Sequence, residues 1–169
     1  MRISEGVEWA IHCCTVLALL PDGTALPAAR LAEFHGVPAA YLAKHLQALA
    51  RTGVVTAAQG PRGGYRLASP AAAVTLLEIV EAVEGDEPAF RCGEIRRRGP
   101  AAVPASGYPK PCGIARAMWR AEEAWRQSLR ETTVADLVTG LAVDVDPRAG
   151  AMRLRAAFTM ATVWTASGA

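Results

Sequence analysis

The stretch "LPAARLAEFHGVPAAYLAKHLQALARTG", residues 26–53, contains two helix patterns separated by a tight turn. In the first, Pro27 stands at a first-turn position and Gly36 at a natural helix end, which predicts a helix of about two turns. Two helices joined by a short turn that contains glycine are typical of a helix-turn-helix. The second helix has one apolar stripe, formed by Leu42, Leu46 and Leu49.

The chain after the second helix changes from helical to alternating periodicity. "VVTAA" at 54–58 and "YRLA" at 65–68 flank the turn cluster "QGPRGG", which predicts a hairpin with a glycine-rich tip. These glycines do not predict a phosphate-binding loop. That motif needs a strand before the loop, a helix after it and a Lys-Ser/Thr end, and this combination is not present. The expected fold is mainly α with a small β-hairpin, a winged helix-turn-helix.

Composition favours a globular protein. The chain has 169 residues and is 51% hydrophobic, which suits one compact domain or a small domain with an appendage. No apolar run reaches roughly 18 residues and glutamates interrupt the N-terminus, so we expect a cytoplasmic protein without a membrane span or signal peptide. In a reducing compartment, four cysteines favour metal ligation or redox sensing over disulfides. For Cys13 and Cys14 we expect burial.

Charge is unevenly spread, although the net charge is only +2. Between residues 27 and 68, five cationic side chains are set against one glutamate, a net charge of +4, whereas residues 70–90 carry only acidic charges. This contrast predicts that the basic segment forms a face that binds a polyanion such as double-stranded DNA. The alternative is that the basic and acidic segments are simply two solvated surfaces.

Polar side chains of the second helix of the helix-turn-helix are candidate DNA contacts, because a helix fits the major groove. Arg62, at the glycine-flanked tip of the hairpin, is suited to a narrow minor groove. For each of these residues, an ordinary solvated surface position is the alternative. The candidates on the helix are Tyr41, Lys44, His45, Gln47 and Arg51.

The first expected helix, which Ser4 is suited to cap, carries the stretch "EWAIHCC" at residues 8–14. Glu8 and His12 are four residues apart and fall on one face of that helix, where a metal could bridge both side chains. Spacing alone does not separate a metal site from an ordinary exposed pair.

Four motifs in this order, "MRISEGVEWAIH", "YLAKHLQALARTGVV", "GPRGGYRLA" and "LLEIVEAVEG", resemble the Rrf-type winged-helix transcriptional regulators. The resemblance covers residues 1 to about 139. It implies a homodimer that binds a pseudo-palindromic operator and has a long C-terminal dimerisation helix. Near-heptad spacing agrees with such a helix, although core packing within one subunit would give the same stripe. The stripe consists of Ile114, Met118, Ala121, Trp125 and Ser128.

Members of this family often sense through an iron-sulfur cluster, and cluster-binding members usually carry three cysteines close together before the dimerisation helix. Only Cys92 and Cys112 occupy that region here. The chain is instead similar to a redox-responsive branch whose 2Fe-2S cluster uses two cysteines, a histidine and a glutamate. That resemblance implies ligation by Cys92 and Cys112 of one subunit with Glu8 and His12 of its partner. An imidazole ligand in place of a thiolate raises the reduction potential of the cluster.

Two alternatives to the cluster remain open. The same four side chains can surround zinc as a closed structural site without a redox response. Otherwise Glu8 and His12 are an exposed pair, and the two cysteines are free thiols or form a reversible disulfide. Trp9 is a candidate for the side chain that transmits a change at the ligands to the recognition helix, the second helix of the helix-turn-helix. Ordinary packing in the core or at an interface is the alternative for Trp9.

These expectations divide the chain into four parts. They are a winged helix-turn-helix at 1–85, a cluster-binding loop at 86–112, a dimerisation helix with a short following helix at 113–139, and a tail at 140–169. In the tail, "DVDPRAG" is typical of a linker. The residues after it are typical of either a weak amphipathic segment or disorder. His35 and His45 lie in the DNA-reading region without catalytic partners, so we do not expect an enzyme.

Overall fold

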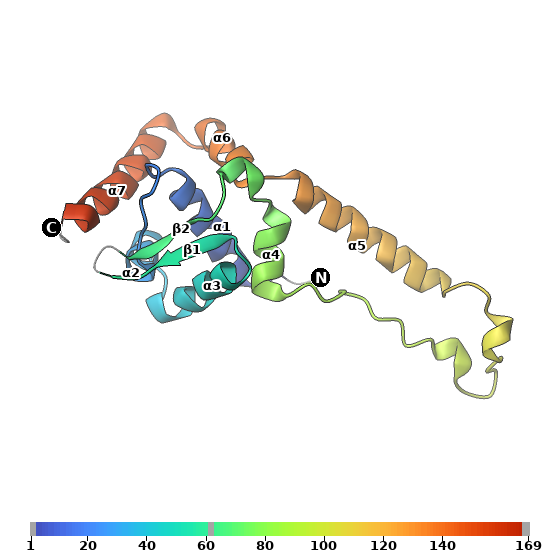
Figure 1. The fold of residues 1–169 in the computed structure, drawn as a ribbon. Coiled ribbons are helices and arrows are strands. Elements are labelled where there is room, and N and C mark those ends of the chain that lie inside the picture. Colours follow the sequence, from blue (N-terminus) through green and yellow to red (C-terminus); the bar gives the residue numbers. More distant parts are fainter. Residues whose placement is uncertain (1–2, 61–62, 167–169) are drawn as a thin grey trace.

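The computed structural model describes residues 3–60 and 63–166 and has a mainly helical fold with one β-hairpin (Figure 1). This architecture confirms the predicted fold class. In chain order the elements are α1 (Glu5–Ala18), α2 (Ala28–His35), α3 (Ala39–Arg51), β1 (Val55–Ala58), β2 (Gly64–Leu67), η1 (Ala71–Ala73), α4 (Leu76–Glu84), η2 (Ile95–Arg97), η3 (Ala105–Gly107), α5 (Gly113–Glu131), α6 (Val134–Asp144) and α7 (Pro147–Ala166).

The helix-turn-helix consists of α2 and α3. Gly36 ends α2 with a φ of 67°, a left-handed conformation that favours glycine, and the Val37 N–H then donates to the Ala32 carbonyl at 3.0 Å. The turn brings the apolar stripe of α3 into the core, where its three leucines are fully buried. The leucine periodicity therefore predicted the buried face of α3 correctly.

The wing is an antiparallel pair in which Val55 lies opposite Leu67 and Ala58 opposite Gly64. Two backbone hydrogen bonds between Leu26 and Tyr65, of 2.7 and 3.0 Å, fasten the wing to the segment before α2. A β-carbon at Gly64 would collide with the Leu26 carbonyl, so glycine is required for this close approach.

The core lies between α1 and the winged helix-turn-helix. Cys13 and Cys14 are fully buried in it, as expected from their position on the first helix. The expected side-chain cap at Ser4 is wrong: Ser4 occupies the N-cap position, but its hydroxyl donates to Glu84 Oε1 at 2.5 Å. Ser4 therefore joins the start of α1 to the end of α4. The largest fully buried side chains are Leu26, Leu31, Leu42, Leu46, Leu49, Ile79, Val55, Val134, Cys13 and Cys14.

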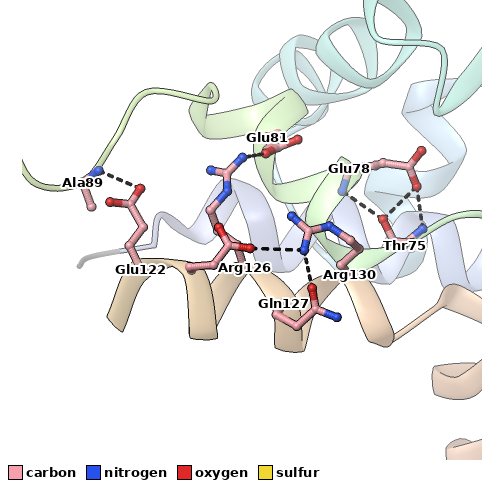
Figure 2. Close-up of polar contacts among 9 residues, drawn as sticks. Thr75, Glu78, Glu81, Ala89, Glu122, Arg126, Gln127 and Arg130 are labelled. Carbon is pink, nitrogen blue, oxygen red and sulfur yellow. Dashed lines mark hydrogen bonds and ion pairs between the residues drawn. The ribbon is translucent and has the colours of Figure 1, made fainter. Parts of the chain in front are cut away.

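Helix α5 and the loop before it extend away from this core (Figure 1). At its C-terminal half α5 is held to α4 by an ion pair between Arg126 and Glu81, while Glu122 accepts from the Ala89 N–H at 3.1 Å (Figure 2). A backbone bridge between Thr75 and Thr133 then brings the chain back to the start of α4. Both threonines begin helices through capping boxes.

The C-terminal residues form helices where the sequence suggested a linker and either a weak amphipathic segment or disorder. Helix α6 runs past the expected end at residue 139 to Asp144, and α7 begins after two intervening residues. Asp146 Oδ1 accepts from the Arg148 N–H at 2.9 Å and Pro147 follows at the first helical position, so the "DP" pair starts a helix. The buried residues Ala157 and Ala161 pack α7 against the core.

Candidate DNA interface and metal-ligating residues

The polar face of α3 is available for contact with DNA. Tyr41 is 57% exposed, and the side chains of Lys44, Gln47 and Arg51 are also on the surface. Neither Lys44 nor Arg51 forms an ion pair within the described residues, so both charges are free to meet phosphate. The Lys44 ammonium lies 5.2 Å from the Tyr41 ring centroid. Four of the five predicted contacts on α3 are thus brought together on one exposed face.

The tip of the wing includes Arg62, which lies outside the described residues. On β2, Arg66 is exposed and donates through Nε to the Thr56 hydroxyl at 3.1 Å. Sequence reasoning counted Arg66 only toward the positive charge of this segment. Its place on β2 adds an exposed cation to the hairpin.

His45 differs from the other predicted contacts on α3, because its ring is directed toward α1. The imidazole packs against Gly6, and a side chain at Gly6 would collide with it. Its Nε2 is buried and has no hydrogen-bond partner in the described chain. This packing favours a positioning role for His45 over direct contact with a base.

Trp9 completes an aromatic contact between α1 and α3. Its ring centroid lies 6.0 Å from that of Tyr41 and 6.2 Å from that of His45, both in edge-to-face geometry. Trp9 is adjacent in sequence to Glu8. We call Trp9, Tyr41 and His45 the aromatic contact, which packs α1 against α3.

Glu8 and His12 are both exposed on α1 and border a shallow surface hollow. The ring of His12 lies 5.7 Å from that of His35 on α2. Burial, and then the charges of His12 and Arg153, lower the pKa of His35 to about 4. The buried Cys13 and Cys14 are poor ligands beside this pair, because burial raises their pKa values and the thiolate is the form that binds metal.

Cys92 and Cys112 are free and half-buried in the loop region before α5. Cys112 stands at the N-terminus of α5, where the nearby backbone N–H groups of Ala115 and Ile114, and the charge of Arg96, hold the pKa of its thiol below the ordinary value. The lowered pKa makes the thiolate of Cys112 easier to form, which suits a metal ligand.

Arg96 organises the loop between the two cysteines, a role that the sequence did not reveal. Its guanidinium contacts both carboxylate oxygens of Glu94, at 2.5 and 2.8 Å, and lies 4.1 Å from the Tyr108 ring centroid. The Tyr108 hydroxyl in turn donates to the Arg96 carbonyl at 3.0 Å. These contacts join the segment after Cys92 to the segment before Cys112.

Within the described part of one chain, no three cysteine, histidine or acidic side chains come together in a way that could hold a metal. Glu8 and His12 lie on α1, whereas the cysteines belong to the region that extends from the core (Figure 1). One chain thus carries Glu8 and His12 in one region and Cys92 and Cys112 in another. In the described part of one chain, these four residues do not form a single site.

A winged helix-turn-helix with an exposed, cationic recognition helix defines the class of DNA-binding transcriptional regulators. The chain belongs to the Rrf2 family, described as an iron-dependent transcriptional regulator, whose model matches residues 3–140. A family of transcriptional regulators agrees with the expectation that the chain is not an enzyme. Among the described residues, no helix is both long and apolar enough to cross a bilayer.

Similar proteins support this assignment. Rv1287 of Mycobacterium tuberculosis, named as a candidate HTH-type transcriptional regulator, is 30% identical over 141 residues that cover 83% of each chain. The structure of CymR, the global cysteine regulator of B. subtilis, matches with a TM-score of 0.63 and 21% identity over 82% of this chain and 97% of that chain. The structure of T. potens IscR matches with a TM-score of 0.63 and 17% identity over 86% of this chain and 93% of that chain. At such identities, the structural matches concern the fold alone.

Proposed function

We propose that the protein is a homodimeric regulator that senses redox state through a 2Fe-2S cluster shared between subunits. Cys92 and Cys112 of one subunit and Glu8 and His12 of its partner would hold the cluster. The observation that carries this proposal is the aromatic contact, because it joins the helix with Glu8 and His12 to the recognition helix. A cluster held in this way can gain and lose one electron, at a potential raised by its non-thiolate ligands.

The chemistry of the donors supports a shared site. The two thiols are free, and Cys112 is biased toward the thiolate that binds iron. Glu8 and His12 are one helical turn apart and both are exposed, so they are available to a second chain. Arg96 positions the cysteine-bearing loop through Glu94 and Tyr108.

The surface of α5 supports dimerisation. Only Ala115 of α5 is buried in the single chain, whereas Ile114 is 67% exposed and Met118 and Trp119 are 44% and 42% exposed. Ile114 and Met118 belong to the near-heptad stripe. We infer that a second copy covers this apolar face, since helices with such a stripe pair in that way. A two-fold dimer would bind a pseudo-palindrome, and a footprint on a single asymmetric half-site would contradict it.

Changes at the cluster would reach DNA through α1. An added negative charge beside Glu8 repels its carboxylate and favours a displacement of the helix. Trp9 is half-buried between α1 and α3, so a displaced α1 must repack against Tyr41 and His45. The base-contacting face of α3 would shift with it.

The alternative function keeps DNA binding and replaces the cluster by structural zinc or by a thiol switch. The lowered pKa of Cys112 favours this alternative as much as it favours metal ligation, because a thiolate is also the reactive form in disulfide exchange. The pair Cys92 and Cys112 would then form a reversible disulfide.

Anaerobic purification separates these functions. For the cluster we expect visible absorption together with iron and acid-labile sulfide in equal amounts, two of each per cluster. Stoichiometric zinc without iron and sulfide would exclude the cluster. A colourless, metal-free protein whose two thiols disappear on oxidation would instead establish the thiol switch.

Arg62→Ala should weaken specific DNA binding by about 1 to 3 kcal/mol, because the predicted contact lies in a minor groove with enhanced negative potential. The measurement is a DNA titration at one salt concentration. Arg148→Ala is the matched control, since Arg148 is an exposed cation on α7, which is part of neither the helix-turn-helix nor the hairpin. Equal affinities of the Arg62→Ala variant and the unchanged protein would remove the wing tip from the interface.

A further inference from the structure

A cavity lies between α1, α2, α6 and α7, apart from the two cysteines. Its volume is about 550 Å³, within the range of sites for small molecules. Its walls are mostly apolar, and they include residues of the C-terminal helix that sequence reasoning had left without a function. The apolar side chains include Val16, Leu19, Phe34, Val138, Leu154 and Ala157.

The polar side chains of the cavity are Thr15, whose hydroxyl donates to the Ile11 carbonyl at 2.9 Å, and three basic residues, His12, His35 and Arg153. His35 Nε2 is buried and makes no hydrogen bond within the described residues, a condition that costs free energy unless a ligand or water satisfies it. The Arg153 guanidinium lies 5.5 Å from the Phe34 ring centroid and forms no ion pair in the described chain. His12, which is also one of the proposed cluster ligands, contributes a second imidazole to the wall.

No aspartate or glutamate is among the described residues that line the cavity. An amine would therefore meet a guanidinium and two imidazoles without an anion to pair with. A neutral apolar molecule would fill the volume but leave Arg153 and His35 Nε2 unpaired. An anion with an apolar body satisfies both the walls and the polar groups.

We propose that this cavity binds a small apolar carboxylic acid as its anion. The planar carboxylate matches the paired N–H groups of Arg153, and the unpartnered Nε2 of His35 supplies a further hydrogen bond. The hydrocarbon body lies against the apolar walls, beside Phe34. The site goes beyond the proposed cluster function, and its ligand would contact α2, the first helix of the helix-turn-helix.

Titration of the full chain with octanoate tests this proposal, with 1-octanol as the neutral probe of the same length. We expect octanoate to bind at least about tenfold more tightly than 1-octanol, since loss of one charge-assisted hydrogen bond costs about that factor. Calorimetry gives the affinities. The imidazole resonances of His35, followed by NMR, should move with octanoate and place the ligand in the cavity.

Two arginine variants make the test specific. Arg153→Gln should weaken octanoate binding about tenfold, whereas Arg155→Gln should leave it unchanged. Both arginines are exposed on α7, but only Arg153 lines the cavity, so neither substitution should disturb folding and equal unfolding temperatures check this. Absence of octanoate binding, equal loss in both variants, equal binding of 1-octanol, or unmoved His35 resonances would each overturn the proposal. None of these outcomes depends on DNA or on a cluster.

Discussion

Replacing Cys92 and Cys112 together by alanine should reduce the iron and sulfide of the anaerobically purified protein to background. The two thiols are the only described cysteines outside the buried core, so no other thiolate can replace them. Folding should be preserved, with a change in unfolding free energy within about 0.5 kcal/mol, because neither side chain belongs to the core. Metal analysis and a denaturant titration measure the two effects.

Cys13→Ala is the matched control for this experiment. It also removes one thiol, but from the core, so it should lower stability by roughly 1 kcal/mol and leave iron and sulfide unchanged. Full iron and sulfide in the Cys92→Ala, Cys112→Ala protein would rule out both residues as ligands.

The second large effect concerns neighbouring residues on α3. Leu46 is fully buried, so Leu46→Ala should lower the free energy of unfolding by about 2 to 5 kcal/mol. Gln47 is exposed on the same helix, so Gln47→Ala should change stability by less than about 0.5 kcal/mol. It should instead weaken specific DNA binding by about 1 to 3 kcal/mol if the amide contacts a base.

Denaturant and DNA titrations of both variants give the comparison. A stability loss at Gln47 similar to that at Leu46 would contradict the assignment of buried and DNA-facing sides of α3. An unchanged DNA affinity of Gln47→Ala would remove this side chain from the predicted contacts.

The DNA-binding half was predictable because its signals are local. The leucine stripe of α3, Gly36 at the turn and the glycines of the wing each specify a backbone conformation or a buried face within a few residues. The same local logic failed at Ser4. The Ser4 hydroxyl donates a hydrogen bond to Glu84, which is 80 residues away in sequence, so no local pattern could indicate that bond.

The candidate site depends more on tertiary contacts. Arg96 and Tyr108 are 12 residues apart within a loop without periodicity, and nothing in their spacing predicts that they stack. Helix α7 packs through the small residues Ala157 and Ala161, which give little hydrophobic signal. The cluster ligands came from a family resemblance, and they stay predictions because the described part of one chain does not bring all four together.

The central claim is that the redox state of a cluster at Glu8, His12, Cys92 and Cys112 controls DNA affinity. Titrating DNA with the oxidised and the reduced protein at one salt concentration tests it most directly. The Cys92→Ala, Cys112→Ala protein, treated with the same oxidant and reductant, is the control. We predict that the two forms differ by about 1 to 3 kcal/mol, the usual size of a coupling free energy, and that the control shows no difference. Equal affinities of the oxidised and reduced forms would contradict a redox-switching role for the site.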